Sequence, residues 1–179
     1  MLKIIKSLIV LLSIILVLFV VIGLLLPKNY VVSRSIVIDA TPQQIHKYVN
    51  NLKKWPEWSP FAEKDPTLVF NMGDKTSGEG AKSSWTGDDN SGSLVITSSS
   101  ADKGIKYDLE FLNGNIKTQR EFIYVMEGQN TKIIWEMTGS RDTPLLGGYF
   151  AAKMDSLFGK DMEKGLQNLK NIVEEKNNY

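Results

Sequence analysis

The residues that could carry chemistry are few, and their types restrict the reactions open to this chain. Its 179 residues include no cysteine and a single histidine, His46. Without cysteine there is no disulfide and no thiolate metal site, and one imidazole makes a histidine metal site or a Ser-His dyad hard to assemble. His46 falls one step away from the apolar stripe of its helix, which favours a surface imidazole. We therefore predict no metal, no cofactor and no catalytic residue.

A strand expected at 120–126 carries the strongest candidates for contact with a ligand. Side chains along a strand alternate between its two faces, so Arg120 and Tyr124 share one face. Arg120 could orient a carboxylate or phosphate, although long basic side chains more often reach out to solvent. Tyr107 and Tyr124 could offer hydroxyl groups to a ligand or could serve only as aromatic core residues.

Acidic residues and glycines add no recognisable catalytic motif. Asp108 and Glu110 alternate with apolar residues along 105–111, so they are expected to face solvent. Gly78-Glu79-Gly80 lacks the third glycine and the strand-to-helix context of a dinucleotide-binding loop. General acid–base catalysis needs a titratable group held in a pocket, and no carboxylate pair stands out for that role.

A long amphipathic helix is expected near the C-terminus, from about residue 144 to 175. Apolar residues recur there at three- and four-residue steps, which places them on one stripe of a helix. Gly147-Gly148 would cost about 1 kcal/mol per residue in a helix, so regular helix is expected after this pair. Gly159 and Gly165 either allow close approach of a sheet or ligand, or are tolerated surface defects.

The middle of the chain predicts an antiparallel meander for this helix to cover. Turn signals separate runs of alternating apolar and polar residues, among them residues 88–92 and Asn113-Gly114, which matches a two-residue hairpin turn. Thr41-Pro42 predicts the start of a short helix after the first strand. The expected strands are 30–39, 67–72, 80–85, 93–99, 105–111, 116–126 and 131–138.

Two tryptophans and two prolines at 55–60 break the short helix. This segment is expected either to plug one end of the core or to form the mouth of a cavity, and the plug is favoured.

Residues 8–26 form an almost unbroken apolar run without charge. At about 1.5 Å per residue, roughly 19 helical residues span the hydrocarbon core of a bilayer. We predict a retained single-pass anchor at residues 1–27 and one domain at 28–179; a cleaved signal and a buried soluble helix are the alternatives. Lys3 and Lys6 favour an inside N-terminus and therefore a domain on the outer face.

Charge argues against a nucleic-acid partner. The net charge is +1, and the domain has no run of basic residues that would hold a phosphate backbone.

The order of these elements resembles the START-like (SRPBCC) superfamily, in its polyketide cyclase/dehydrase-type branch. The likeness covers about residues 30–175 and implies an α+β helix-grip (Bet v 1-like) fold. In that fold a curved antiparallel sheet wraps around a long C-terminal helix and encloses an apolar cavity between sheet and helix. It rests on residues 34–42, Leu52 with Trp55, residues 58–60, 65–66, 78–81 and 85–87, and residues 165–170.

Three functions fit such a domain. A membrane-tethered module that binds a hydrophobic small molecule or lipid is the leading hypothesis. A non-catalytic protein-interaction module would instead show a collapsed cavity, and a cyclase or dehydrase would need a buried ionisable group in its cavity. The cavity candidates are Trp58, Trp85, Tyr107, Phe111, Arg120, Tyr124, Trp135, Met154 and Phe158.

Overall fold

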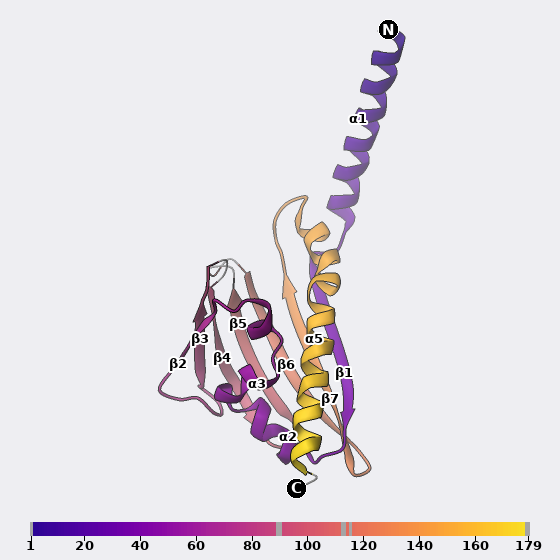
Figure 1. Ribbon diagram of the computed structural model, residues 1–179. Helices are drawn as coiled ribbons and strands as arrows, with labels where there is room; N and C mark the ends of the chain where they lie inside the picture. Colours follow the sequence, from indigo (N-terminus) through magenta and orange to yellow (C-terminus); the bar gives the residue numbers. More distant parts are fainter. Residues whose placement is uncertain (1, 89–90, 112–113, 115, 178–179) are drawn as a thin grey trace.

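The computed structural model describes residues 2–88, 91–111, 114 and 116–177 (Figure 1). The helices are α1 (Leu2–Leu25), α2 (Pro42–Val49), η1 (Leu52–Lys54), α3 (Trp55–Trp58), α4 (Phe61–Lys64) and α5 (Gly147–Asn177). The strands are β1 (Asn29–Ile38), β2 (Val69–Met72), β3 (Lys82–Thr86), β4 (Ser91–Ser100), β5 (Gly104–Phe111), β6 (Ile116–Glu127) and β7 (Asn130–Ser140).

In the described part of the chain, one antiparallel sheet of seven strands has the order β1-β7-β6-β5-β4-β3-β2. Each expected strand is present within a few residues of its predicted ends, because alternating burial follows the alternating sequence. Gly114 has φ 81°, as the expected hairpin requires. Asn113 of that turn, and Asp89 and Asn90 of the 88–92 turn, lie outside the described residues.

Helix α2 begins as the sequence predicts. Thr41 and Gln44 form a capping box in which each side chain bonds the other residue's backbone N–H, and Pro42 occupies the first turn.

Helix α5 lies against β1 and β7, and the sheet curves around it (Figure 1). The helix begins at Gly147, so the expectation that the Gly147-Gly148 pair precedes it is wrong. A Cβ at Gly147 would overlap the Arg141 carbonyl, and one at Gly148 would overlap Leu26. Both glycines are therefore needed for close packing, which offsets their low helix propensity.

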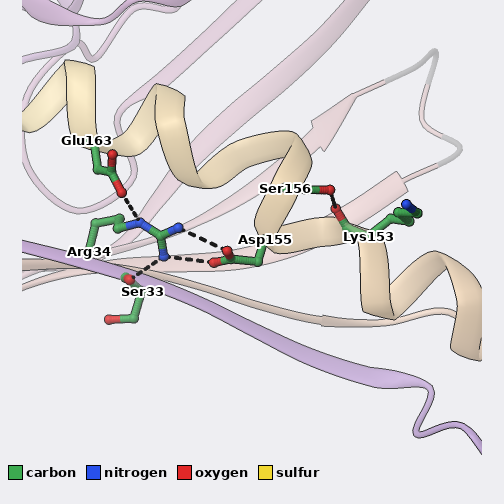
Figure 2. Close-up of polar contacts among 6 residues, drawn as sticks. All are labelled: Ser33, Arg34, Lys153, Asp155, Ser156 and Glu163. Carbon is green, nitrogen blue, oxygen red and sulfur yellow. Dashed lines mark hydrogen bonds and ion pairs between the residues drawn. The ribbon is translucent and has the colours of Figure 1, made fainter.

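Arg34 of β1 joins the sheet to α5, in a group that we call the Arg34 clamp (Arg34, Asp155 and Glu163; Figure 2). Its guanidinium donates to both carboxylate oxygens of Asp155 at 2.8 and 3.1 Å and to Glu163 at 2.6 Å. A Cβ at Gly159 would collide with this guanidinium, and one at Gly165 would lie 2.9 Å from the Trp135 ring. Both glycines therefore serve close approach of the sheet.

Helix α1 extends away from the domain with exposed apolar side chains (Figure 1). Its length and composition fit a membrane span, and a signal sequence near an N-terminus would show the same features. Its C-terminal part contacts the start of α5. The Phe19 and Tyr149 rings stack at 4.7 Å, and the Tyr149 hydroxyl donates to the Phe19 carbonyl at 2.7 Å.

Candidate ligand-binding cavity

A cavity of about 510 Å³ lies between the inner face of strands β2–β7 and the segment from Leu52 to Leu68. The sheet supplies aromatic and aliphatic side chains, and the short helices α3 and α4 with their connections form the opposite wall. Helix α5 contributes Phe158. The wall facing the sheet is therefore built mainly by an irregular segment rather than by the long helix.

Six of the nine side chains expected at a cavity line this one. They are Trp85, Tyr107, Phe111, Arg120, Trp135 and Phe158. Ligand contact by any of them stays a prediction.

The other three candidates do not line this cavity. Trp58 is fully buried against the rings of Phe122 and Trp135, each 5.9 Å away, so it fills the core next to the cavity. Met154 is fully buried in α5. Tyr124 lies farther along β6 beside His46. Each shares an inward face with lining residues, but the cavity occupies only part of that face.

The segment at 55–60 has both of its proposed roles. Trp58 plugs the core, as favoured, while Trp55, Pro56 and Ser59 line the cavity. The Trp55 indole donates to the Val49 carbonyl at 2.8 Å, and this hydrogen bond orients the Trp55 ring, which lines the cavity. Most of this wall could not be predicted from the sequence, because irregular backbone has no period that shows which way its side chains face. The paired prolines and tryptophans were the available signal. The missed lining residues are Leu52, Trp55, Pro56, Ser59, Phe61, Lys64, Asp65, Pro66, Leu68, Phe70, Met72, Ser83, Leu94 and Leu109.

Arg120 lies inside the protein rather than reaching solvent. Its exposure is 3%, so the favoured expectation of a solvent-directed side chain is wrong. Arg120 pairs with Tyr107 on one side and Met137 on the other, deep within the sheet, and its guanidinium lies 5.4 Å from the Phe158 ring centre. Neighbouring strands and this ring block its path outward.

Beside Arg120, the Tyr107 hydroxyl accepts a hydrogen bond of 2.9 Å from the Trp135 indole. Burial raises the pKa of Tyr107 to about 12, and the Arg120 charge acts in the opposite direction. Tyr107 is therefore a neutral phenol at physiological pH. Its ring is fully enclosed, so its hydroxyl is held in one place.

Charged side chains at the edge of the cavity are engaged with the protein. Lys64 pairs with Asp161 at 2.6 Å, and Asp65 accepts hydrogen bonds from the backbone and hydroxyl of Thr67. Among the described residues, no three His, Asp or Glu side chains gather where they could hold a metal ion.

His46 is half-buried, so the expected surface imidazole is wrong. Its Nδ1 lies 3.3 Å from the Tyr124 hydroxyl and its Nε2 lies 3.2 Å from Ser99 Oγ. Desolvation lowers the pKa of His46, partly opposed by Asp102. Ser99 donates its proton to Asn50 Oδ1 at 2.6 Å, which leaves the serine engaged with an amide. This group lies outside the cavity lining and joins α2 to β4 and β6.

Comparisons with known proteins are consistent with this architecture. Residues 30–174 match the model of the family described as polyketide cyclase / dehydrase and lipid transport. No curated protein matches the chain.

Solved structures share the fold at low sequence identity. Protein CV1439 from Chromobacterium violaceum is 12% identical, with a TM-score of 0.60 over 80% of this chain and 96% of that chain. TTHA0849 from Thermus thermophilus is 15% identical, with a TM-score of 0.58 and the same coverages. Ara h 8.0201 is 12% identical, with a TM-score of 0.57 over 81% of this chain and 97% of that chain. These matches confirm the expected helix-grip fold.

Proposed function

The chain belongs to the polyketide cyclase/dehydrase and lipid transport family, and on that premise we propose that it binds one hydrophobic small molecule or lipid in its cavity. The observation that carries this proposal is the cavity itself, about 510 Å³ with mostly apolar and aromatic walls. Small-molecule sites commonly measure about 300–1,000 Å³ and combine apolar walls with a few polar groups.

The open volume favours a ligand over the alternative of a protein-interaction module. That alternative expects the same fold with its cavity collapsed, because side chains would then fill the space. Here Trp85, Phe70 and Phe158 line an open cavity instead of filling it. Space of this size loses dispersion contacts unless something occupies it.

We further propose that α1 anchors the domain to a membrane, which would place the cavity near its source of ligand. The strand ends at Phe111 and Ser140 and the strand start at Asn29 lie at one end of the sheet, from which α1 departs (Figure 1). Phe111 lines the cavity at this end. A lipophile leaving the bilayer would therefore have a short path to the cavity.

The anchor and its orientation can be tested on intact cells. Lys3 and Lys6 favour a domain on the outer face. Protease added to intact cells should therefore digest the domain. A domain that survives protease in intact cells but not in lysed cells would reverse the orientation. Full release of the chain from membranes by carbonate washing would show that α1 does not span the bilayer.

Ligand binding can be tested on the full chain in mild non-ionic detergent. Native mass spectrometry should detect a co-purifying lipophile, and the purified protein should bind the neutral fluorescent probe methyl cis-parinarate. Leu109→Trp places an indole in the cavity and should abolish both signals.

Val125→Trp adds the same ring at an exposed position on β6 and should leave binding intact. Wild-type protein that carries no lipophile and does not bind the neutral probe would refute the proposed function. Equal binding by the Leu109→Trp variant, shown to be folded by its thermal unfolding, would place the ligand elsewhere.

A further inference from the structure

Three hydrogen-bond donors meet on the cavity wall, and we call them the donor cluster (Tyr107, Arg120 and Trp135). All three side chains line the cavity. Arginine and the tryptophan indole can only donate, whereas the tyrosine hydroxyl can donate once and also accept. The Tyr107 oxygen already accepts from Trp135, and within the described ranges its own proton has no acceptor.

The guanidinium of Arg120 adds an uncompensated positive charge. Among the residues that the structure describes, Arg120 has no ion pair. Its Nε donates to Thr118 Oγ1 at a long 3.4 Å, and its other polar neighbour is the neutral Tyr107 hydroxyl. The Phe158 ring gives a weak cation–π contact at 5.4 Å. A buried charge normally has a counter-charge, because removing it from water costs several kcal/mol.

Neither Asp65, which lines the cavity, nor Asp161, which pairs with the lining residue Lys64, neutralises this charge. Asp65 accepts from Thr67, and Asp161 pairs with Lys64. Within the described residues the guanidinium of Arg120 therefore has no anionic partner, and the empty volume of the cavity lies next to it.

We propose that the ligand is an amphiphile with one anionic head, a carboxylate or a phosphate, which accepts hydrogen bonds from Arg120 and Tyr107. This inference rests on the proposed function and adds the chemical class of the ligand. A planar guanidinium binds either anion in a two-point arrangement, and such charge-assisted bonds are about twice as strong as neutral ones.

The register of the sheet gives the direction in which the ligand lies. Phe111 and Ile116 pair at the end of the sheet next to α1, whereas Tyr107 and Arg120 pair four residues farther in. Trp85 and Leu68 also line the cavity near the α1 end. The anionic head therefore lies deep in the domain, and the apolar tail extends toward the side where α1 leaves (Figure 1).

A pair of probes that differ only in charge tests the inference. cis-Parinaric acid and its methyl ester share one fluorescent chain, and both are titrated into the full-length protein in non-ionic detergent. Wild type should bind the acid about tenfold or more tightly than the ester, as expected for a charge-assisted contact. Arg120→Met should lower acid affinity to that of the ester and leave ester affinity unchanged.

Two further variants separate the effect of the donor cluster from the effect of any positive charge on the same strand. Tyr107→Phe removes the hydroxyl alone and should weaken acid binding less than Arg120→Met does. Lys117→Met removes a positive charge from the exposed face of the same strand and should change neither affinity. If Arg120→Met does not fold, Arg120→Gln and Tyr107→Phe provide the same comparison.

The outcomes separate the two proposals. If neither probe binds, the proposed function fails. If the ester binds and the acid binds no more tightly, or if folded Arg120→Met keeps the preference for acid, the donor cluster inference fails and the proposed function stands. Competition by oleate against oleyl phosphate, a phosphate monoester with a similar chain, then distinguishes a carboxylate from a phosphate head.

Discussion

Two arginines on inward-facing strand positions have opposite surroundings. Arg34 on β1 faces α5 and is bonded by two carboxylates and the Ser33 carbonyl (Figure 2). Arg120 on β6 faces the cavity, is more deeply buried, and among the described residues has only neutral polar neighbours, the Thr118 and Tyr107 hydroxyls. Within the described residues, the same side chain is thus paired with carboxylates in one region and has no anionic partner in the other.

The difference separates an arginine that holds the helix on the sheet from an arginine that we propose binds a ligand. The Arg34 clamp lies at the surface, where an arginine–carboxylate pair orients the helix on the sheet at little desolvation cost. Arg120 incurs a desolvation cost without a counter-charge, which lowers stability unless a ligand offsets it. Variants at the two sites should therefore shift stability in opposite directions.

Replacing Arg120 by methionine should give the largest effect. Arg120→Met removes an uncompensated buried charge and keeps apolar volume, so delipidated protein should gain about 2 kcal/mol in free energy of unfolding. Denaturant titration of the full chain in detergent measures this change. A loss of stability would mean that the protein itself compensates Arg120.

Replacing Arg34 should have the opposite sign and a smaller size. Arg34→Met should lower the free energy of unfolding by roughly 1 kcal/mol, because partly exposed ion pairs are weak. High salt should narrow the gap between this variant and wild type. An unchanged gap at high salt would show that the packing of the arginine stem, rather than its charge, holds α5.

Gly159 tests whether the clamp needs a glycine under its guanidinium. In wild type, Gly159→Ala displaces Arg34, so the gain in helix propensity of up to about 1 kcal/mol should be cancelled. In the Arg34→Met background the same change should stabilise by up to that amount. A double-mutant cycle measures the coupling; additive effects would contradict the contact.

Lowering the pH should weaken the Arg34 clamp, and the resulting change in stability should be the smallest of the four. The Arg34 hydrogen bond holds the pKa of Asp155 below its ordinary value of 3.8. The stabilisation is therefore complete above pH 3.8 and is lost as pH falls through the lower folded value. Thermal unfolding between pH 5 and pH 2 should show a shallower acid loss for Asp155→Asn, whereas Arg120→Met should keep the wild-type slope.

Local patterns predicted most of the fold. Alternation along 105–111 and the three- to four-residue spacing after Phe150 depend on chain geometry alone, so the strands and α5 lie close to their predicted ranges. The start of α5 was misplaced because low propensity at Gly147 is outweighed by contact with Arg141, about which local sequence carries no information.

The site was only partly predictable. Aromatic residues on regular strands, such as Phe111 and Trp135, could be assigned to an inward face, and they line the cavity. Tyr124 has the same facing but lies outside the lining, because position along the strand decides which inward residues meet open space. The wall from Trp55 to Leu68 has no period from which its facing could be read.

The apolar N-terminal helix, the meander, the long C-terminal helix and the family could all be predicted from residue order and spacing alone, because each depends on local pattern. The surroundings of the two arginines depend on the folded chain: Arg34 contacts carboxylates, whereas Arg120 lies beside Tyr107, Trp135 and empty volume. Strands and helices far apart in the chain set those surroundings, and a buried charge is defined by what is brought next to it.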